Sequence, residues 1–151
     1  MLSERLQSCL NGGSILVGTV DAEGVPATCR GIAGRIDDAL RRFTVYVPVQ
    51  TAQETIANVA TTRRIAVGVS QPLTHQSLQI KGATAGVRLA RPDEAPLLQQ
   101  TVETVAAILE EVGLPRRLSR AMNHWPAFAI DVVVEDIFEQ TPGPNAGTPI
   151  R

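Results

Sequence analysis

The sequence has few aromatic residues and almost no lysine. One Trp, one Tyr and three Phe make up only 3% of 151 residues, which argues against stacking the bases of single-stranded nucleic acid. The formal net charge is −1, so the charge balance favours neither nucleic acid nor an anionic membrane as partner. Thirteen arginines stand against one lysine, Lys81. Because the arginine fork matches carboxylate and phosphate, this excess favours anion binding, although a GC-rich coding bias would produce it too.

Cysteine is also scarce, and long apolar runs are missing. Cys9 and Cys29 lack CxxC spacing, which predicts reduced thiols in a cytoplasmic protein rather than a metal site or a disulfide framework. Residues 1–10 carry Glu4 and Arg5 and do not resemble a signal peptide. No stretch approaches the roughly 20 apolar residues of a membrane span. Neither the dinucleotide-binding glycine motif nor the P-loop occurs.

The hydrophobic pattern predicts a single mainly β domain over residues 1–151. Six strands are expected, at residues 14–20, 25–37, 43–49, 63–70, 76–88 and 127–140. Helices are expected within residues 1–13, at 51–61, after 93 and at 116–124, with Ser3, Thr51 and Asp93 as caps of the first three and an extended tail at 141–151. The first three strands form a meander with short links, which disfavours parallel winding. A closed or half-closed antiparallel β-barrel with attached helices fits this order best.

Small residues mark one face of the strand at 63–70. Ile65, Val67 and Val69 share one face, whereas Ala66, Gly68 and Ser70 share the other. A face with such small side chains lets a flat ligand approach the sheet, and it equally lets a helix pack close to the sheet. The pattern leaves both interpretations open.

Polar residues alternate at the start of the strand at 76–88. His75, Ser77, Gln79 and Lys81 would share one face if the strand begins that early. They form either a solvated outer face or a row of donors for a polar ligand. A hydrolytic site is poorly supported, because no Gly-x-Ser-x-Gly elbow activates the serine. A metal site lacks further ligands with suitable spacing around the second histidine, His124.

Arg30 and Arg35 lie five positions apart in the second predicted strand. Odd spacing puts them on opposite faces of a regular strand, although Gly31 and Gly34 permit a bulge. They are either ordinary surface arginines, or at least one contacts an anion while the glycines let a ligand approach the backbone. The N-terminus of the helix at 51–61 is a second possible anion site, because its N–H groups are free.

Four segments, taken in order, resemble a known family. They read "VGTVDAEGVPATCRG", "FTVYVP", "RRIAVGVSQPLTHQSLQIKG" and "FEQTPGPNAG", within roughly residues 14–147. They resemble the pyridoxamine 5′-phosphate oxidase-like flavoproteins, especially small members with a "THxxLQxKG" strand and a "TPGPxAG" tail. The resemblance implies a six-stranded antiparallel split barrel of the FMN-binding type. It also implies a homodimer that binds FMN in clefts at the dimer interface.

The resemblance also assigns candidate FMN contacts. In the oxidases, an arginine followed five residues later by a lysine marks the strand beside the flavin, and Arg30 and Arg35 stand at that spacing. The end of the third strand would follow, and Ser77 falls near the family's polar position in the fifth strand. Together with the helix start and the polar row, the candidate cofactor-binding residues are Arg30, Gly31, Ile32, Ala33, Arg35, Val47, Pro48, Thr51, His75, Ser77 and Lys81.

One departure from the family concerns the FMN phosphate. The oxidases bind it partly through a Ser-Arg-Lys run at the helix after the third strand, where this sequence has "QTAQET" at residues 50–55. Each lost charge-assisted contact is worth on the order of 1.5–3 kcal/mol. Helix N–H groups and the hydroxyls of Thr51 and Thr55 offset part of that loss. The pyridoxal-phosphate pocket of the oxidases is not recognisable, so their substrate is not implied.

The leading hypothesis is a cytoplasmic, homodimeric, FMN-dependent oxidoreductase that acts on an unidentified small molecule. The flavin would supply the redox chemistry, and the protein would supply orientation and electrostatics. The alternative is a non-catalytic module for a flavin or a haem that has lost strong FMN binding, and a purely structural dimer is a third possibility. No nucleic-acid or membrane partner is expected.

Overall fold

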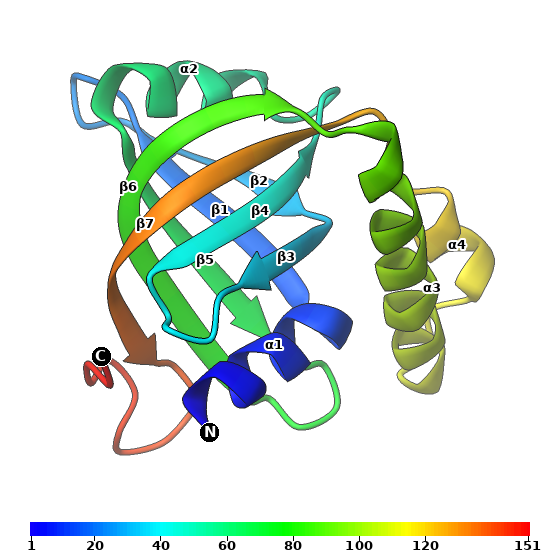
Figure 1. Cartoon of the computed structure of the whole chain (residues 1–151). Helices are drawn as coiled ribbons and strands as arrows, with labels where there is room; N and C mark the ends of the chain where they lie inside the picture. The colour runs from blue at the N-terminus through cyan, green and yellow to red at the C-terminus, as the bar shows by residue number, and fades with distance from the viewer.

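One curled antiparallel sheet of seven strands forms the centre of the computed structural model, which describes residues 1–151 (Figure 1). The strands are β1 (Ser14–Val20), β2 (Pro26–Gly31), β3 (Ala33–Ile36), β4 (Arg42–Pro48), β5 (Arg64–Ser70), β6 (Ser77–Leu89) and β7 (Ala127–Glu139). Their order across the sheet is β2-β1-β5-β6-β7-β4-β3, and all neighbours pair antiparallel. The expectation of a mainly β, antiparallel half-barrel with helices is therefore confirmed.

The predicted strand at 25–37 is wrong as one element, and so is the count of six. It divides at Ile32 into β2 and β3, which lie at opposite edges of the sheet, so the expected three-stranded meander does not form. The Ile32 N–H donates to the Tyr46 carbonyl oxygen at 2.8 Å, which binds the turning point to β4. A Cβ on Gly31 would lie 2.4 Å from Ile15 Cγ2, so only glycine fits where the chain crosses between the edges.

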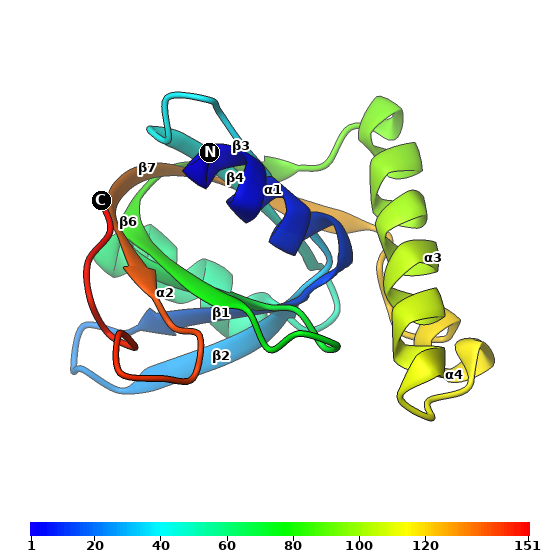
Figure 2. The same cartoon turned by 90° about the horizontal axis from the view of Figure 1, so that it is seen from below.

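Two helices close the ends of the curled sheet (Figures 1 and 2). α1 (Leu2–Gly12) buries Leu6 and Leu10, and α2 (Gln53–Thr62) buries Val59, all in the main core inside the sheet. The predicted caps are wrong. Met1 precedes α1, with Ser3 already helical, and Ala52 precedes α2 without a side-chain cap, while Thr51 lies in the turn before it.

The remaining helices stand beside the barrel as an arm (Figure 2). The arm comprises the 3₁₀ turn η1 (Pro92–Glu94), α3 (Ala95–Glu111) and α4 (Arg116–Arg120). Asp93, the predicted cap of α3, lies within η1, and Glu94 precedes the helix instead. The arm reaches the sheet through Leu98, which is fully buried in a second cluster on the outside of β3, β4 and β7. None of the helices is both long and apolar enough to cross a membrane.

The outward surface of the sheet has two halves. The covered half, on β3, β4 and β7, lies beneath the arm and includes Ala33, Tyr46 and Ala129. The bare half, on β2, β1, β5 and β6, presents Leu16, Gly18, Thr28, Arg30, Ala66, Gly68, Gln79 and Lys81 in register across the strands. A Cβ on Gly68 would meet nothing within 4 Å, so no helix packs there. The interpretation that a helix packs on the small residues Ala66, Gly68 and Ser70 of β5 is therefore wrong.

Candidate functional site

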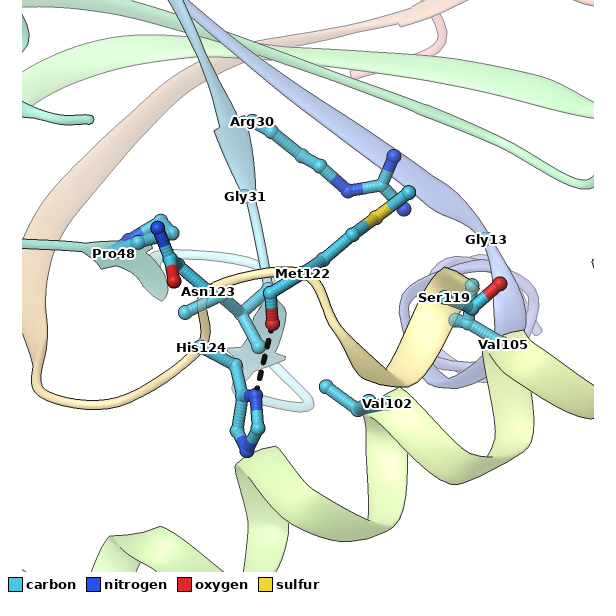
Figure 3. Close-up of a pocket in the computed structure, with 11 residues that line it drawn as sticks. Gly13, Arg30, Gly31, Pro48, Val102, Val105, Ser119, Met122, Asn123 and His124 are labelled. Atoms are coloured by element: carbon cyan, nitrogen blue, oxygen red, sulfur yellow. Dashed lines mark hydrogen bonds between the residues drawn. The ribbon is translucent and has the colours of Figure 1, made fainter. Parts of the chain in front are cut away.

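Four candidate FMN contacts line one pocket where the barrel meets the arm (Figure 3). Arg30, Gly31 and Ile32 form one wall at the end of β2, together with Pro48 at the end of β4. The other walls are formed by Gly13, Val102, Val105, Ser119, Met122, Asn123 and His124. Nothing in the sequence predicted the pocket residues from the arm, because their contact with β2 depends on how the arm folds back. The pocket encloses about 40 Å³.

Arg30 is the charged group of this pocket. Its side chain points outward from β2, and it forms no hydrogen bond or ion pair within the chain. In the close-up it extends toward Met122 (Figure 3). A guanidinium with all its donors free can bind a carboxylate or a phosphate in a fork.

The glycines beside Arg30 do not open the backbone to a ligand as expected. A Cβ on Gly31 would meet Ile15, and a Cβ on Gly34 would meet Leu10 at 2.7 Å and Phe43 at 2.9 Å. Both glycines therefore make room for core side chains. On the bare half of the sheet, by contrast, a Cβ on Gly68 would meet nothing within 4 Å, and a Cβ on Gly18 would meet only the Ala66 carbonyl oxygen, at 3.8 Å.

The other candidates from this region lie apart from the pocket. Arg35 points outward from β3, opposite Thr44, and both arginines are exposed because the strand divides between them. Ala33 and Val47 are fully buried, so any contact they make with a ligand comes from the backbone. Thr51 lies in the exposed turn before α2 and caps nothing.

The polar row of β6 begins later than its spacing suggested. His75 lies in the preceding turn with φ +58°, and its imidazole has no hydrogen-bond partner. Ser77, Gln79 and Lys81 do alternate outward, as predicted. Ser77 Oγ lies 2.8 Å from Ser70 Oγ, and Lys81 Nζ lies 4.8 Å from the centre of the Phe138 ring. This row belongs to the bare half and does not line the pocket at Arg30.

A buried ionic cluster fixes the arm on the covered half. Glu94, only 3% exposed, accepts hydrogen bonds from Arg88 at 2.7 and 2.8 Å, from the Tyr46 hydroxyl at 2.8 Å and from the Arg91 N–H at 2.7 Å. Arg88 lowers the pKa of Glu94 well below its usual range, with help from Arg91 and Tyr46. Burial, followed by the bond to Glu94, raises the pKa of Tyr46. Nothing in the sequence predicted this cluster, since its members come from three separate elements, β4, β6 and η1.

The start of α2 is a poor site for a phosphate. Its first turn carries Glu54 and no basic residue, and Thr55 is buried. An acidic side chain near the free N–H groups opposes a bound dianion. The departure noted in the sequence therefore persists in the structure.

No protein-family model and no curated protein sequence matches this chain. Solved structures do match it along most of its length. HupZ from Group A Streptococcus has a TM-score of 0.59 at 20% identity, covering 97% of this chain and 100% of that one. A putative pyridoxamine 5′-phosphate oxidase from Lactobacillus delbrueckii has a TM-score of 0.57 at 12% identity, covering 89% and 91%.

An FMN-binding protein from Syntrophomonas wolfei also matches, with a TM-score of 0.55 at 9% identity, covering 99% of this chain and 89% of that protein. Identities this low establish the fold alone. The chain has the split-barrel fold of the pyridoxamine 5′-phosphate oxidase-like proteins, as the sequence resemblance predicted.

Proposed function

We propose that this protein is a homodimeric flavoprotein that binds FMN along Arg30, Gly31, Ile32 and Pro48. The observation that carries the proposal is that these four residues line one pocket at the edge of a bare sheet surface. The fold, shared with an FMN-binding protein, supports the same assignment. Bound FMN would supply hydride or electron transfer, so the proposed activity is that of an FMN-dependent oxidoreductase.

The role proposed for Arg30 is to bind an anionic part of the cofactor. It is the only arginine, lysine or carboxylate side chain that lines the pocket, and the imidazole of His124 already contacts Gln99 and the Met122 carbonyl oxygen. Ile32 and Pro48 offer an apolar wall, which suits a planar ring system. The pocket thus combines one free cation with an apolar surface.

The proposed second copy covers the bare half of the sheet. Leu16 is 58% exposed at the centre of that half, between Arg30 on β2 and Gly68 on β5. An exposed apolar side chain beside small residues suits close contact with a flat partner surface. Such pairing would place Arg30 next to the second subunit and bring the FMN site to the dimer interface.

FMN titration of the purified protein tests this proposal. Binding should quench flavin fluorescence, and Arg30→Gln should weaken binding by about ten-fold or more, because it removes a charge-assisted contact. Riboflavin, which lacks the phosphate, reports whether that contact is made to the phosphate. Arg41→Gln is the matched control, since Arg41 is an exposed arginine of the β3–β4 turn. Absence of binding below millimolar FMN, or equal binding by both variants, would disprove the assignment.

A non-catalytic flavin-binding module is the second candidate. Glu54 and the missing basic residues at the start of α2 favour it, because they leave the phosphate with fewer positive contacts. The two functions differ in turnover. An oxidoreductase with bound FMN should oxidise NADPH or NADH and pass the electrons to dioxygen, whereas a binding module should show the flavin spectrum without steady-state oxidation.

A further inference from the structure

The pocket at Arg30 is much smaller than FMN. It encloses about 40 Å³, whereas sites for ligands of drug size measure roughly 300 Å³ or more. The wall that limits it is the segment at residues 116–125, which supplies Ser119, Met122, Asn123 and His124. We call this segment the flap. FMN cannot occupy the proposed site while the flap keeps its present position.

The hydrogen bonds and ion pairs of the flap reach α3 and not the barrel, although the chain continues from Trp125 through Pro126 into β7. Its side-chain bonds to other elements all reach α3: Arg116 to Glu110 at 2.7 Å, Arg120 to Glu103 at 2.6 Å, and His124 Nε2 to Gln99 at 3.0 Å. Its remaining hydrogen bonds stay within the flap or reach Pro115, and none joins it to a strand. Most of its side chains are exposed, with the exception of Ser119 and His124. A segment held this way can move without breaking the sheet.

The closed position also leaves one polar group unsatisfied. Ser119 is 4% exposed, and its Oγ has no hydrogen-bond partner (Figure 3). A buried hydroxyl without a partner disfavours the state that buries it, because water would satisfy it on exposure. Gly113, with φ +98°, lies at the junction between α3 and the flap, where the backbone can change direction. The flap is thus held to α3 by few side-chain bonds, is joined to α3 near a glycine, and buries a hydroxyl that opening would expose to water.

We propose that the flap is a lid that moves away from the wall formed by Arg30, Gly31 and Ile32 to admit FMN, and that it then covers the bound cofactor from a position further from that wall than in the free protein. This inference rests on the proposed FMN site. It predicts that the free protein opens at the flap far more often than it unfolds. It also predicts that the exchange of cofactor is governed by the bonds between the flap and α3.

The first test measures opening without FMN. In the Ser119→Cys variant, the introduced thiol should react with a disulfide reagent at least about ten-fold faster than Cys9 and Cys29, since local opening needs less free energy than global unfolding. Cys9 and Cys29 are 1% and 7% exposed and serve as internal standards, read by mass spectrometry. Hydrogen exchange of the wild-type amides at 116–125, compared with those of β5, gives the same information without a substitution. Equal rates in both measurements would overturn the lid.

The second test changes the attachment to α3. Arg120→Gln removes the ion pair with Glu103, so it should speed thiol labelling in the Ser119→Cys background and FMN association by at least about two-fold. Arg117→Gln is the matched control, since Arg117 lies in the same helix and is exposed without an ion pair. Equal rates for the two variants would contradict the proposed role of the α3 bonds.

The third test joins the lid to the cofactor. Saturating FMN should slow the labelling by at least about five-fold, because the bound cofactor lies between the flap and the Arg30 wall and covers residue 119. If FMN binds and labelling does not slow, FMN does not lie beneath the flap and the inference fails. If labelling is fast and FMN does not bind, the proposed function fails while the opening of the flap stands.

Discussion

The two halves of the outward sheet surface differ in the contacts that they offer to the chain's own helices. On the covered half, Tyr46 and Arg88 project from the strands and bind Glu94, so the arm has a polar anchor as well as the apolar contact of Leu98. On the bare half, Gly18 and Gly68 offer no side chain to bind, and no helix of the chain settles there. The difference indicates that a surface of small residues is not enough to bring this chain's own helices onto the sheet. The bare half therefore remains available to a molecule outside the chain.

The largest expected effect comes from breaking the anchor of the covered half. Glu94→Gln keeps the size of the side chain but removes the charge that Arg88 and Tyr46 surround. Loss of one partner of a buried pair costs about 3–5 kcal/mol, and here we expect about 2–3 kcal/mol in the free energy of unfolding, because the Arg88 side chain is 34% exposed. Urea denaturation followed by circular dichroism measures this loss.

A second glutamate–arginine pair on the same arm provides the control. Glu103 accepts from Arg120 at 2.6 Å, but the two side chains are 39% and 50% exposed. Solvent screens such a pair, so Glu103→Gln should leave the urea midpoint almost unchanged. A similar loss in both variants would mean that burial of Glu94 contributes nothing special to the covered half.

Acid weakens the Glu94 anchor and also a second ion pair, which joins Arg5 of α1 to Glu139 at the end of β7. The folded protein holds the pKa of Glu94 well below its usual range, and Arg5 and Thr141 lower the pKa of Glu139 from 4.5 to about 2. A carboxyl group with a depressed pKa in the folded state stabilises it above the unfolded pKa, and that stability is lost as the pH falls through the folded pKa. Stability should therefore decline from about pH 4.5 toward pH 2.

Substitutions at the paired residues show which carboxyl groups cause this loss of stability in acid. Arg5→Gln and Glu139→Gln each remove the Arg5–Glu139 pair, so both should reduce the slope of unfolding free energy against pH between about pH 4.5 and 2. Glu94→Gln should reduce it further, since Glu94 lies in the more buried cluster. A slope that is unchanged in all three variants would show that other carboxyl groups govern acid unfolding.

The sequence predicted well what depends on local pattern. Alternation identified the inward residues Ile65, Val67 and Val69 of β5, and the period of α3 identified its helix, although the cap was assigned to Asp93 instead of Glu94. It failed at Ile32, because the division of β2 from β3 is decided by pairing with two distant strands. Continuous β propensity through residues 25–37 contains no information about which edge each half joins.

The sequence predicted only those residues of the candidate site that belong to the barrel, because the others are brought there by contacts between distant parts of the chain. Arg30, Gly31, Ile32 and Pro48 come from segments that resemble the family, and the structure brings them to one pocket. Ser119 and the other flap residues of the pocket lie some 90 residues after Arg30 in the chain. Their position depends on Glu94, which fixes the arm on the sheet. No local signal in the sequence connects Ser119 with Arg30.

The smallest expected effect on stability comes from a substitution on the bare half. The same substitution tests whether a second copy of the chain binds there. Gly68→Val places a side chain where a Cβ meets nothing within 4 Å, and valine suits a strand better than glycine. The unfolding free energy of the isolated chain should rise or stay within about 1 kcal/mol. If a second copy packs on this half, the added methyl groups should weaken self-association by about ten-fold or more, since overpacking an interface costs about 1–3 kcal/mol.

Gly86→Val is the control for this last comparison. Like Gly68 of β5, Gly86 of β6 has open space around it, but Gly86 lies opposite Asp131, outside the bare half. Its substitution should leave self-association unchanged, as measured by sedimentation velocity over a range of protein concentrations. If Gly68→Val and Gly86→Val self-associate as the wild type does, the bare half is not the subunit interface. The FMN site would then have to be completed by the flap alone, and the labelling rates of Ser119→Cys would have to be independent of protein concentration.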